Sequence, residues 1–124
     1  MIRVVLLAAI LLTALLSGCV DESRPSGCDE EAIEIAVALT ASEMTPSSPM
    51  ACRGQQVTLV VESDVDAVFH IHGYDDAVPA TEVSAGESTR LEFTADRAGQ
   101  FPIEIHPADD PRGVEVGIFT VHAS

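Results

Sequence analysis

Four histidines occur in this chain. Two of them, His70 and His72, are spaced so that their side chains could bind one metal ion together. They lie in segment 67–72, where Phe69 and Ile71 alternate with polar residues as on a β-strand. Side chains two residues apart on a strand share one face, with Cα atoms about 6–7 Å apart. Two imidazoles at that distance can converge on one ion, and imidazole suits Cu, Zn, Fe and Ni. The pair therefore predicts a metal site, and a solvated pair on a polar strand face is the structural alternative.

The segments that must position these histidines have the pattern of short β-strands. Apolar residues alternate with period two in segments 32–40, 56–63, 67–72, 88–95, 100–106 and 114–121. Turn-forming residues separate the segments, and none has a convincing helical period. We expect one all-β domain, a β-sandwich of about six to eight strands. Pro102 is expected at a sheet edge or in the first pairs of its strand.

Several of these segments resemble the framework of cupredoxin-like domains. Residues 63–75 resemble the third-strand region, and residues 53–59 resemble the start of the second strand. Residues 95–101 are similar to the approach to the penultimate strand, and residues 116–121 to the last strand. The His-Ile-His-Gly-Tyr segment also resembles the cupredoxin-like domain of periplasmic iron-uptake components. The resemblance implies a Greek-key cupredoxin-like β-sandwich over residues 32–124.

The resemblance also implies where a blue copper centre would have its ligands, which are two His, a Cys and an axial Met. The first His falls on His70 or His72. The other three positions hold residues of the wrong type, namely Ile105 for the Cys, Asp109 or Asp110 for the second His, and Glu115 for the Met. Three of four ligands are missing, so conventional blue-copper electron transfer is not expected.

A different metal site remains possible, because the third and penultimate strands are neighbours in cupredoxin-like domains. His106 is then placed to supply a third nitrogen, with Glu104 or Glu115 as candidate carboxylate ligands and Tyr74 as a candidate donor to a ligand. A site without thiolate favours Cu(II) or Zn(II) over Cu(I). The alternation of its strand argues against this site, because it points His106 away from the core. His122 is expected to be exposed.

The start of the chain indicates where the domain is located. Residues 1–3 carry a positive charge and residues 4–16 are apolar apart from Thr13, as in a secretory signal. The apolar run is too short for a transmembrane helix. Residues 16–19, Leu-Ser-Gly-Cys, resemble the lipobox of bacterial lipoproteins. The resemblance implies a signal peptide over residues 1–18, lipidation of Cys19, a tether over residues 19–31 and an extracytoplasmic domain anchored to a bacterial membrane.

Cys28 and Cys52 are the two cysteines that remain. In an oxidising compartment two such thiols form a disulfide more often than a metal or redox site, and they lack Cys-x-x-Cys spacing. A Cys28–Cys52 disulfide is therefore expected.

The charge of the chain limits its partners. Its 20 Asp and Glu residues face six Arg and no Lys, which gives a formal charge of −14. Such a field repels phosphate backbones, so nucleic acid is not an expected partner. Acidic pairs such as Asp75 and Asp76 are expected to be solvated loop charges.

Two functional hypotheses follow. The first is an accessory protein that binds copper, or in second place iron or zinc, through His70, His72 and His106, with an unidentified protein partner in metal transport. The second is a metal-free interaction or scaffold module. No hydrolase, metalloprotease or phosphate-loop motif occurs, so an enzyme is not expected. The fold alone does not choose between the two hypotheses.

Overall fold

The structure, a computed structural model, describes residues 25–123. The predicted signal peptide, Cys19 and the tether up to residue 24 lie outside the described residues. Within them the chain forms nine strands: β1 (Ala32–Leu39), β2 (Met44–Thr45), β3 (Met50–Cys52), β4 (Gln56–Ser63), β5 (Ala67–Ile71), β6 (Thr81–Val83), β7 (Glu87–Thr94), β8 (Gly99–Pro107) and β9 (Val114–His122). No helix is present in this part of the chain, hence none that could span a bilayer.

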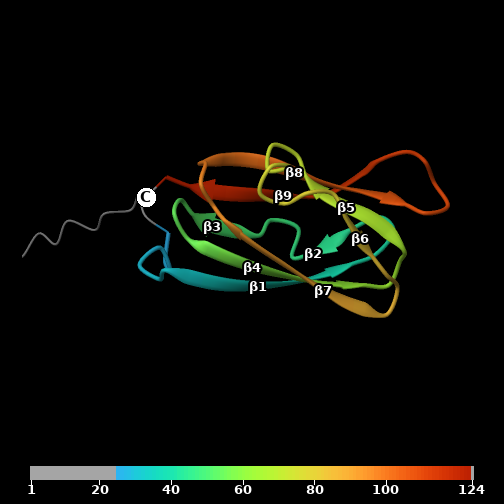
Figure 1. The fold of residues 1–124 in the computed structure, drawn as a ribbon, viewed down its shortest axis with the longest axis horizontal. Helices are drawn as coiled ribbons and strands as arrows, with labels where there is room; N and C mark the ends of the chain where they lie inside the picture. Colours follow the sequence, from blue (N-terminus) through green and yellow to red (C-terminus); the bar gives the residue numbers. More distant parts are fainter. Residues whose placement is uncertain (1–24, 124) are drawn as a thin grey trace, which may run out of the picture.

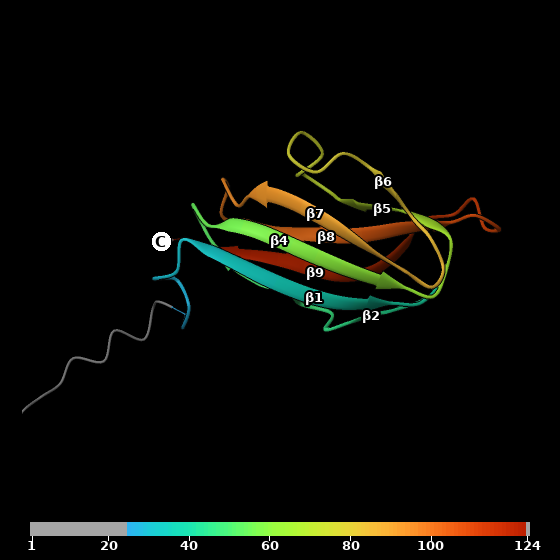
Figure 2. The same ribbon diagram turned by 60° about the horizontal axis from the view of Figure 1, so that its bottom comes forward.

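The strands form two sheets that pack face to face (Figures 1 and 2). One sheet has the order β2-β1-β4-β7 and the other the order β3-β9-β8-β5-β6. The pairs β1–β4 and β3–β9 are parallel, and the other pairs are antiparallel. The predicted all-β sandwich is confirmed. The strand number exceeds the expected six to eight because β2, β3 and β6 have only two or three residues and lie within stretches that read as loops.

The core lies between the sheets and is built by period-two alternation. Phe69 and Ile71 of β5 and Ile103 and Ile105 of β8 have no exposed surface. Burial of each such side chain contributes about 1.5–3 kcal/mol relative to exposure. A shift of the strand pairing by one residue would expose these side chains to solvent. Their burial therefore fixes the register. It also fixes the outward direction of the residues between them, including His70.

Strand β8 lies inside the five-stranded sheet, between β9 and β5. Pro102 is therefore not at a sheet edge. It lies just before the first β5–β8 pair, Ile71 with Ile103, and its carbonyl accepts a hydrogen bond from the His72 N–H at 2.9 Å. The missing N–H of Pro102 thus costs no bond of the β5–β8 ladder, but Pro102 is the fourth residue of β8 and pairs with Ile118 of β9, so it is not among the first pairs of its strand either.

Residues 25–31, which belong to the predicted tether, lie against the sandwich. The predicted Cys28–Cys52 disulfide is present, with the Cα atoms 5.4 Å apart. The buried Gln55 side chain donates from Nε2 to the carbonyls of Gly27 (2.8 Å) and Glu30 (2.9 Å). Both ends of the described chain lie at one end of the sandwich, and the β8–β9 loop lies at the other (Figure 1).

Candidate metal centre

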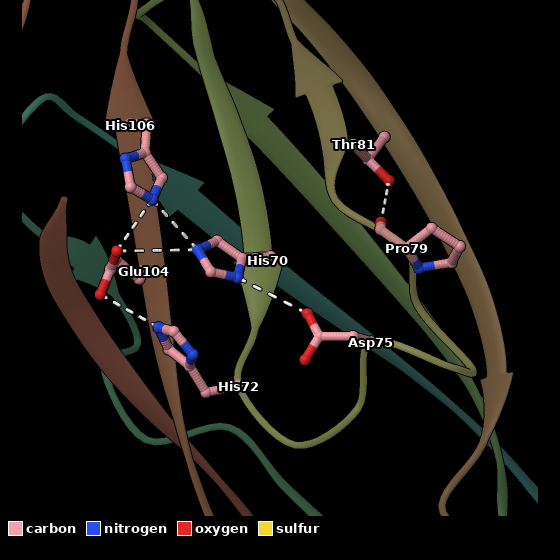
Figure 3. A network of polar contacts seen from close by, with 7 residues as sticks. All are labelled: His70, His72, Asp75, Pro79, Thr81, Glu104 and His106. Carbon is pink, nitrogen blue, oxygen red and sulfur yellow. Dashed lines mark hydrogen bonds and ion pairs between the residues drawn. The ribbon is translucent and has the colours of Figure 1, made fainter. Parts of the chain in front are cut away.

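Four polar side chains from two neighbouring strands meet on the outward face of the five-stranded sheet (Figure 3). His70 lies on β5 and His72 follows it, while Glu104 and His106 lie on β8. In the antiparallel β5–β8 pair, His70 is directly opposite Glu104. Directly opposed residues share a face of the sheet, and diagonal neighbours stay within reach of long side chains. The pleat of the strands points the three histidines away from the core, as predicted. Because β5 and β8 are neighbours, the three side chains meet on the outward face of the sheet.

The Glu104 carboxylate is the centre of this cluster. Its Oε1 lies 2.8 Å from Nε2 of His106 and 3.7 Å from Nε2 of His70. The two Nε2 atoms lie 3.3 Å apart. These three residues therefore each offer one ligand atom, and all three atoms lie within 4.8 Å of one another.

The separations fit a shared metal ion. Ligand atoms about 2.1 Å from an ion in tetrahedral geometry lie about 3.4 Å from one another. The observed separations of 2.8, 3.3 and 3.7 Å fall on either side of that value. Two imidazole nitrogens and one carboxylate oxygen are a ligand set that suits Cu(II), Zn(II) and Fe(II). Small side-chain movements would complete the site without any change in the sheet.

His72 contacts the other oxygen of the same carboxylate. Its Nε2 lies 3.0 Å from Glu104 Oε2, and its side chain is 46% exposed. His72 thus lies beside the three converging atoms and holds the carboxylate that supplies one of them. The hydrogen bond to His72, and the charges of the three histidines when protonated, hold the pKa of Glu104 below its ordinary value despite a smaller opposing effect of burial. Glu104 is therefore ionised at neutral pH, which is the state that a metal ligand needs.

The loop after β5 supplies a partner for the second nitrogen of His70. Asp75 Oδ1 lies 3.7 Å from His70 Nδ1 (Figure 3). This distance is too long for a direct hydrogen bond. The carboxylate charge still favours a proton on Nδ1 and so the tautomer that leaves Nε2 free, as outer carboxylates do for metal-binding histidines. Asp75 is exposed, as predicted, but sequence reasoning did not place it near His70.

Tyr74 does not act as a donor to the site, contrary to the sequence prediction. Its side chain is fully buried and packs edge-on against Phe101, with ring centroids 4.5 Å apart. Its hydroxyl donates to the Arg97 carbonyl at 2.7 Å and accepts from the Arg97 N–H at 3.0 Å. Burial raises the pKa of Tyr74. Tyr74 instead anchors the loop in the core, and this anchor places its neighbour Asp75 beside His70.

The positions of a blue copper centre do not hold suitable residues in the structure either. Ile105 is fully buried in the core and Glu115 is exposed. Asp110 accepts hydrogen bonds from Arg112 within the β8–β9 loop. Both cysteines in the described part of the chain are joined in the disulfide, so neither offers a thiolate. Glu115 pairs in register with Glu104 but is not in the converging group.

His122 is not exposed, contrary to expectation. It lies at the end of β9 opposite Cys52, and its Nε2 is buried without a hydrogen-bond partner among the described residues. With Met50 and Pro25 it lines a small pocket of about 80 Å³. It is not part of the metal-capable group.

Comparison with solved structures identifies the fold. An apo copper-binding protein solved by NMR matches with a TM-score of 0.56 and 17% identity over 75% of this chain and 90% of its own. Auracyanin B matches with a TM-score of 0.51 and 17% identity over 71% of this chain and 87% of its own. The blue copper oxidase from Nitrosomonas europaea matches with a TM-score of 0.57 and 15% identity over 76% of this chain.

This chain spans about two fifths of the length of that oxidase (40%) and of another multicopper oxidase (42%). No protein-family model matches the chain, and no curated protein sequence does. The resemblances to lipoproteins and to iron-uptake components therefore stay predictions. The structural matches, in contrast, agree with one another on architecture. The described domain is a cupredoxin-like β-sandwich.

Proposed function

We propose that this protein is an accessory metal carrier that binds one Cu(II) ion through His70, Glu104 and His106. The observation that carries the proposal is the convergence of three ligand atoms within 4.8 Å on one sheet face. An N/O ligand set without thiolate disfavours Cu(I), and Cu(II) binds such sets most tightly among the divalent first-row metals. Zn(II) and Fe(II) are the weaker candidates. The copper-binding neighbour of the same fold supports this choice.

The exposure of the ligands supports transport over storage. The side chains of two of the three proposed ligands, Glu104 and His106, are 26% and 40% exposed, so a partner protein can reach the ion from this side. A site with open positions exchanges its ion through ligands of the partner. We place the protein outside the cytoplasm, on a membrane, held by a lipid on Cys19 as the lipobox resemblance implies. Two acyl chains anchor a protein stably, whereas one holds it marginally.

A metal-free role is the second candidate, and one observation favours it. Glu104 already contacts three imidazoles, two of them at 3.0 and 2.8 Å, so both oxygens of its carboxylate have partners without an ion. Such a network would stabilise the β5–β8 face of a scaffold module.

Calorimetric titration of the full-length protein in detergent with Cu(II), Zn(II) and Fe(II) separates the two candidates. A carrier binds Cu(II) with one-to-one stoichiometry, and the double variant His70→Ala/His106→Ala loses this binding. His122→Ala is the matched control, because His122 lies outside the group. Equal binding by the wild type and the double variant would leave the scaffold role.

A further inference from the structure

We infer that Gly113 is a positioning residue, whose missing side chain leaves the space in which the Glu104 carboxylate lies against His70 and His106. Gly113 ends the loop between β8 and β9, residues 108–113. There the backbone passes directly beside the Glu104 side chain. The inference rests on the proposed function, because it concerns how that metal site is built.

The space beside Gly113 is filled by the ligand itself. A Cβ atom on Gly113 would fall against Glu104 Oε1, 2.5 Å from Cδ and 3.1 Å from Cγ. Oε1 is the same atom that lies 2.8 Å from His106 Nε2. Because the carboxylate is the far end of a flexible side chain, it would swing away while the backbone stays in place. A side chain at position 113 would therefore remove the oxygen from the converging group.

Glycine is needed at this position for space and not for backbone conformation. Five of the seven glycines in the described residues have a positive φ, which favours glycine by itself: Gly27, Gly54, Gly73, Gly86 and Gly99. Gly113 is not among them, so alanine fits its backbone without strain. A methyl group at position 113 would therefore act by steric contact with the Glu104 side chain, and not by straining the backbone.

The surrounding structure limits how far the loop can retreat from such a methyl group. The Ala108 N–H donates to the Asp66 carbonyl at 3.0 Å, and the Asp110 N–H donates to the Pro107 carbonyl at 3.1 Å. Asp110 Oδ1 in turn accepts from the Arg112 N–H at 3.0 Å. The pairing of β8 with β9 shifts between Ile103 and Glu104, where Val116 of β9 is the extra residue, as in a β-bulge. Bulges re-aim side chains and are common beside functional sites.

The test compares Gly113→Ala with Gly86→Ala in the full-length protein. Cu(II) affinity is measured by titration, and the His72 ring signals are measured by NMR without metal. We expect Gly113→Ala to weaken Cu(II) binding at least tenfold. Gly113→Ala should also shift the NMR signals of the His72 ring in the metal-free protein, because it disturbs the Glu104–His72 contact of 3.0 Å. Gly86→Ala strains a backbone with φ of +80° but meets no atom within 4 Å. It should lower the melting temperature and change neither readout.

A rescue variant distinguishes a displaced carboxylate from a damaged loop. Asp at position 104 is one methylene shorter and makes room for the new methyl group. The double variant Glu104→Asp/Gly113→Ala should therefore bind Cu(II) with an affinity within twofold of that of Glu104→Asp alone. The inference is overturned if Gly113→Ala leaves both the affinity and the His72 signals at wild-type values. If the wild type itself binds no metal, the proposed function fails, and the metal-free His72 signals of Gly113→Ala still decide whether Gly113 positions Glu104.

Discussion

His70 and Glu104 are directly opposite each other in the β5–β8 pair, and His70 Nε2 lies 3.7 Å from Glu104 Oε1. The site is built around this pair. His106 lies two residues from Glu104 on β8, and His72 lies two residues from His70, so each is a diagonal neighbour on the same face. The register that buries the apolar residues of β5 and β8 therefore also brings together the residues of the candidate metal centre.

Replacing Glu104 by Gln should weaken Cu(II) binding at least tenfold, because the amide retains the shape of the side chain but loses the charge that a metal ligand supplies. Titration calorimetry measures the change. Glu115→Gln is the matched control, since Glu115 faces Glu104 in register yet lies outside the converging group. Equal losses in the two variants would show that overall acidity, and not ligation by Glu104, holds the ion.

The lowered pKa of Glu104 predicts how stability depends on pH without metal. The folded pKa lies below the ordinary value of 4.5, so folding favours the ionised form. The stabilisation is complete above pH 4.5 and is lost as pH falls through the folded pKa. Denaturant unfolding of the wild type and Glu104→Gln should therefore show a difference that shrinks as pH falls below about 4.5. A difference that grows toward acid pH would contradict the direction of this shift.

Asp75→Asn should reduce Cu(II) affinity about tenfold, at the low end of the 10–100-fold cost of removing an outer partner of a ligating histidine. The reason is the 3.7 Å approach of Asp75 Oδ1 to His70 Nδ1, which favours the productive tautomer. Asp76→Asn is the control, because it removes the same charge one residue away. If both variants bind like the wild type, Asp75 has no orienting role.

Removal of the disulfide by Cys28→Ser/Cys52→Ser should lower the free energy of unfolding by about 3 kcal/mol, since the bond closes a loop with a sequence separation of 24. Denaturant titration measures this loss. Cu(II) binding of the folded variant should stay at the wild-type value, because neither cysteine belongs to the site. Loss of binding under conditions where the variant is folded would mean that the disulfide supports the metal centre.

Much of the fold could be predicted from the sequence because alternation directly reports which side of a strand is buried. Phe69, Ile71, Ile103 and Ile105 have the predicted inward direction and no exposed surface. The resemblance to cupredoxin-like domains supplied what alternation cannot, namely that the strands carrying His70 and His106 are neighbours.

The composition of the site was harder to predict, because it depends on register and on loop closure. Alternation places His106 away from the core but does not say that His70 faces Glu104 across the pair. The position of Asp75 depends on the burial of Tyr74. This burial could not be predicted, because the residues next to Tyr74 in the sequence are mostly polar. His122 is half-buried because it pairs with Cys52 beside the N-terminal segment, a contact between distant parts of the chain.

The most direct test of the metal centre is Cu(II) EPR of the full-length protein in detergent at neutral pH, for the wild type and for His70→Ala/His106→Ala. We predict one bound Cu(II) per chain, with hyperfine structure from two imidazole nitrogens in the wild type and without it in the double variant. Indistinguishable spectra of the two proteins would contradict a copper site built by His70, Glu104 and His106.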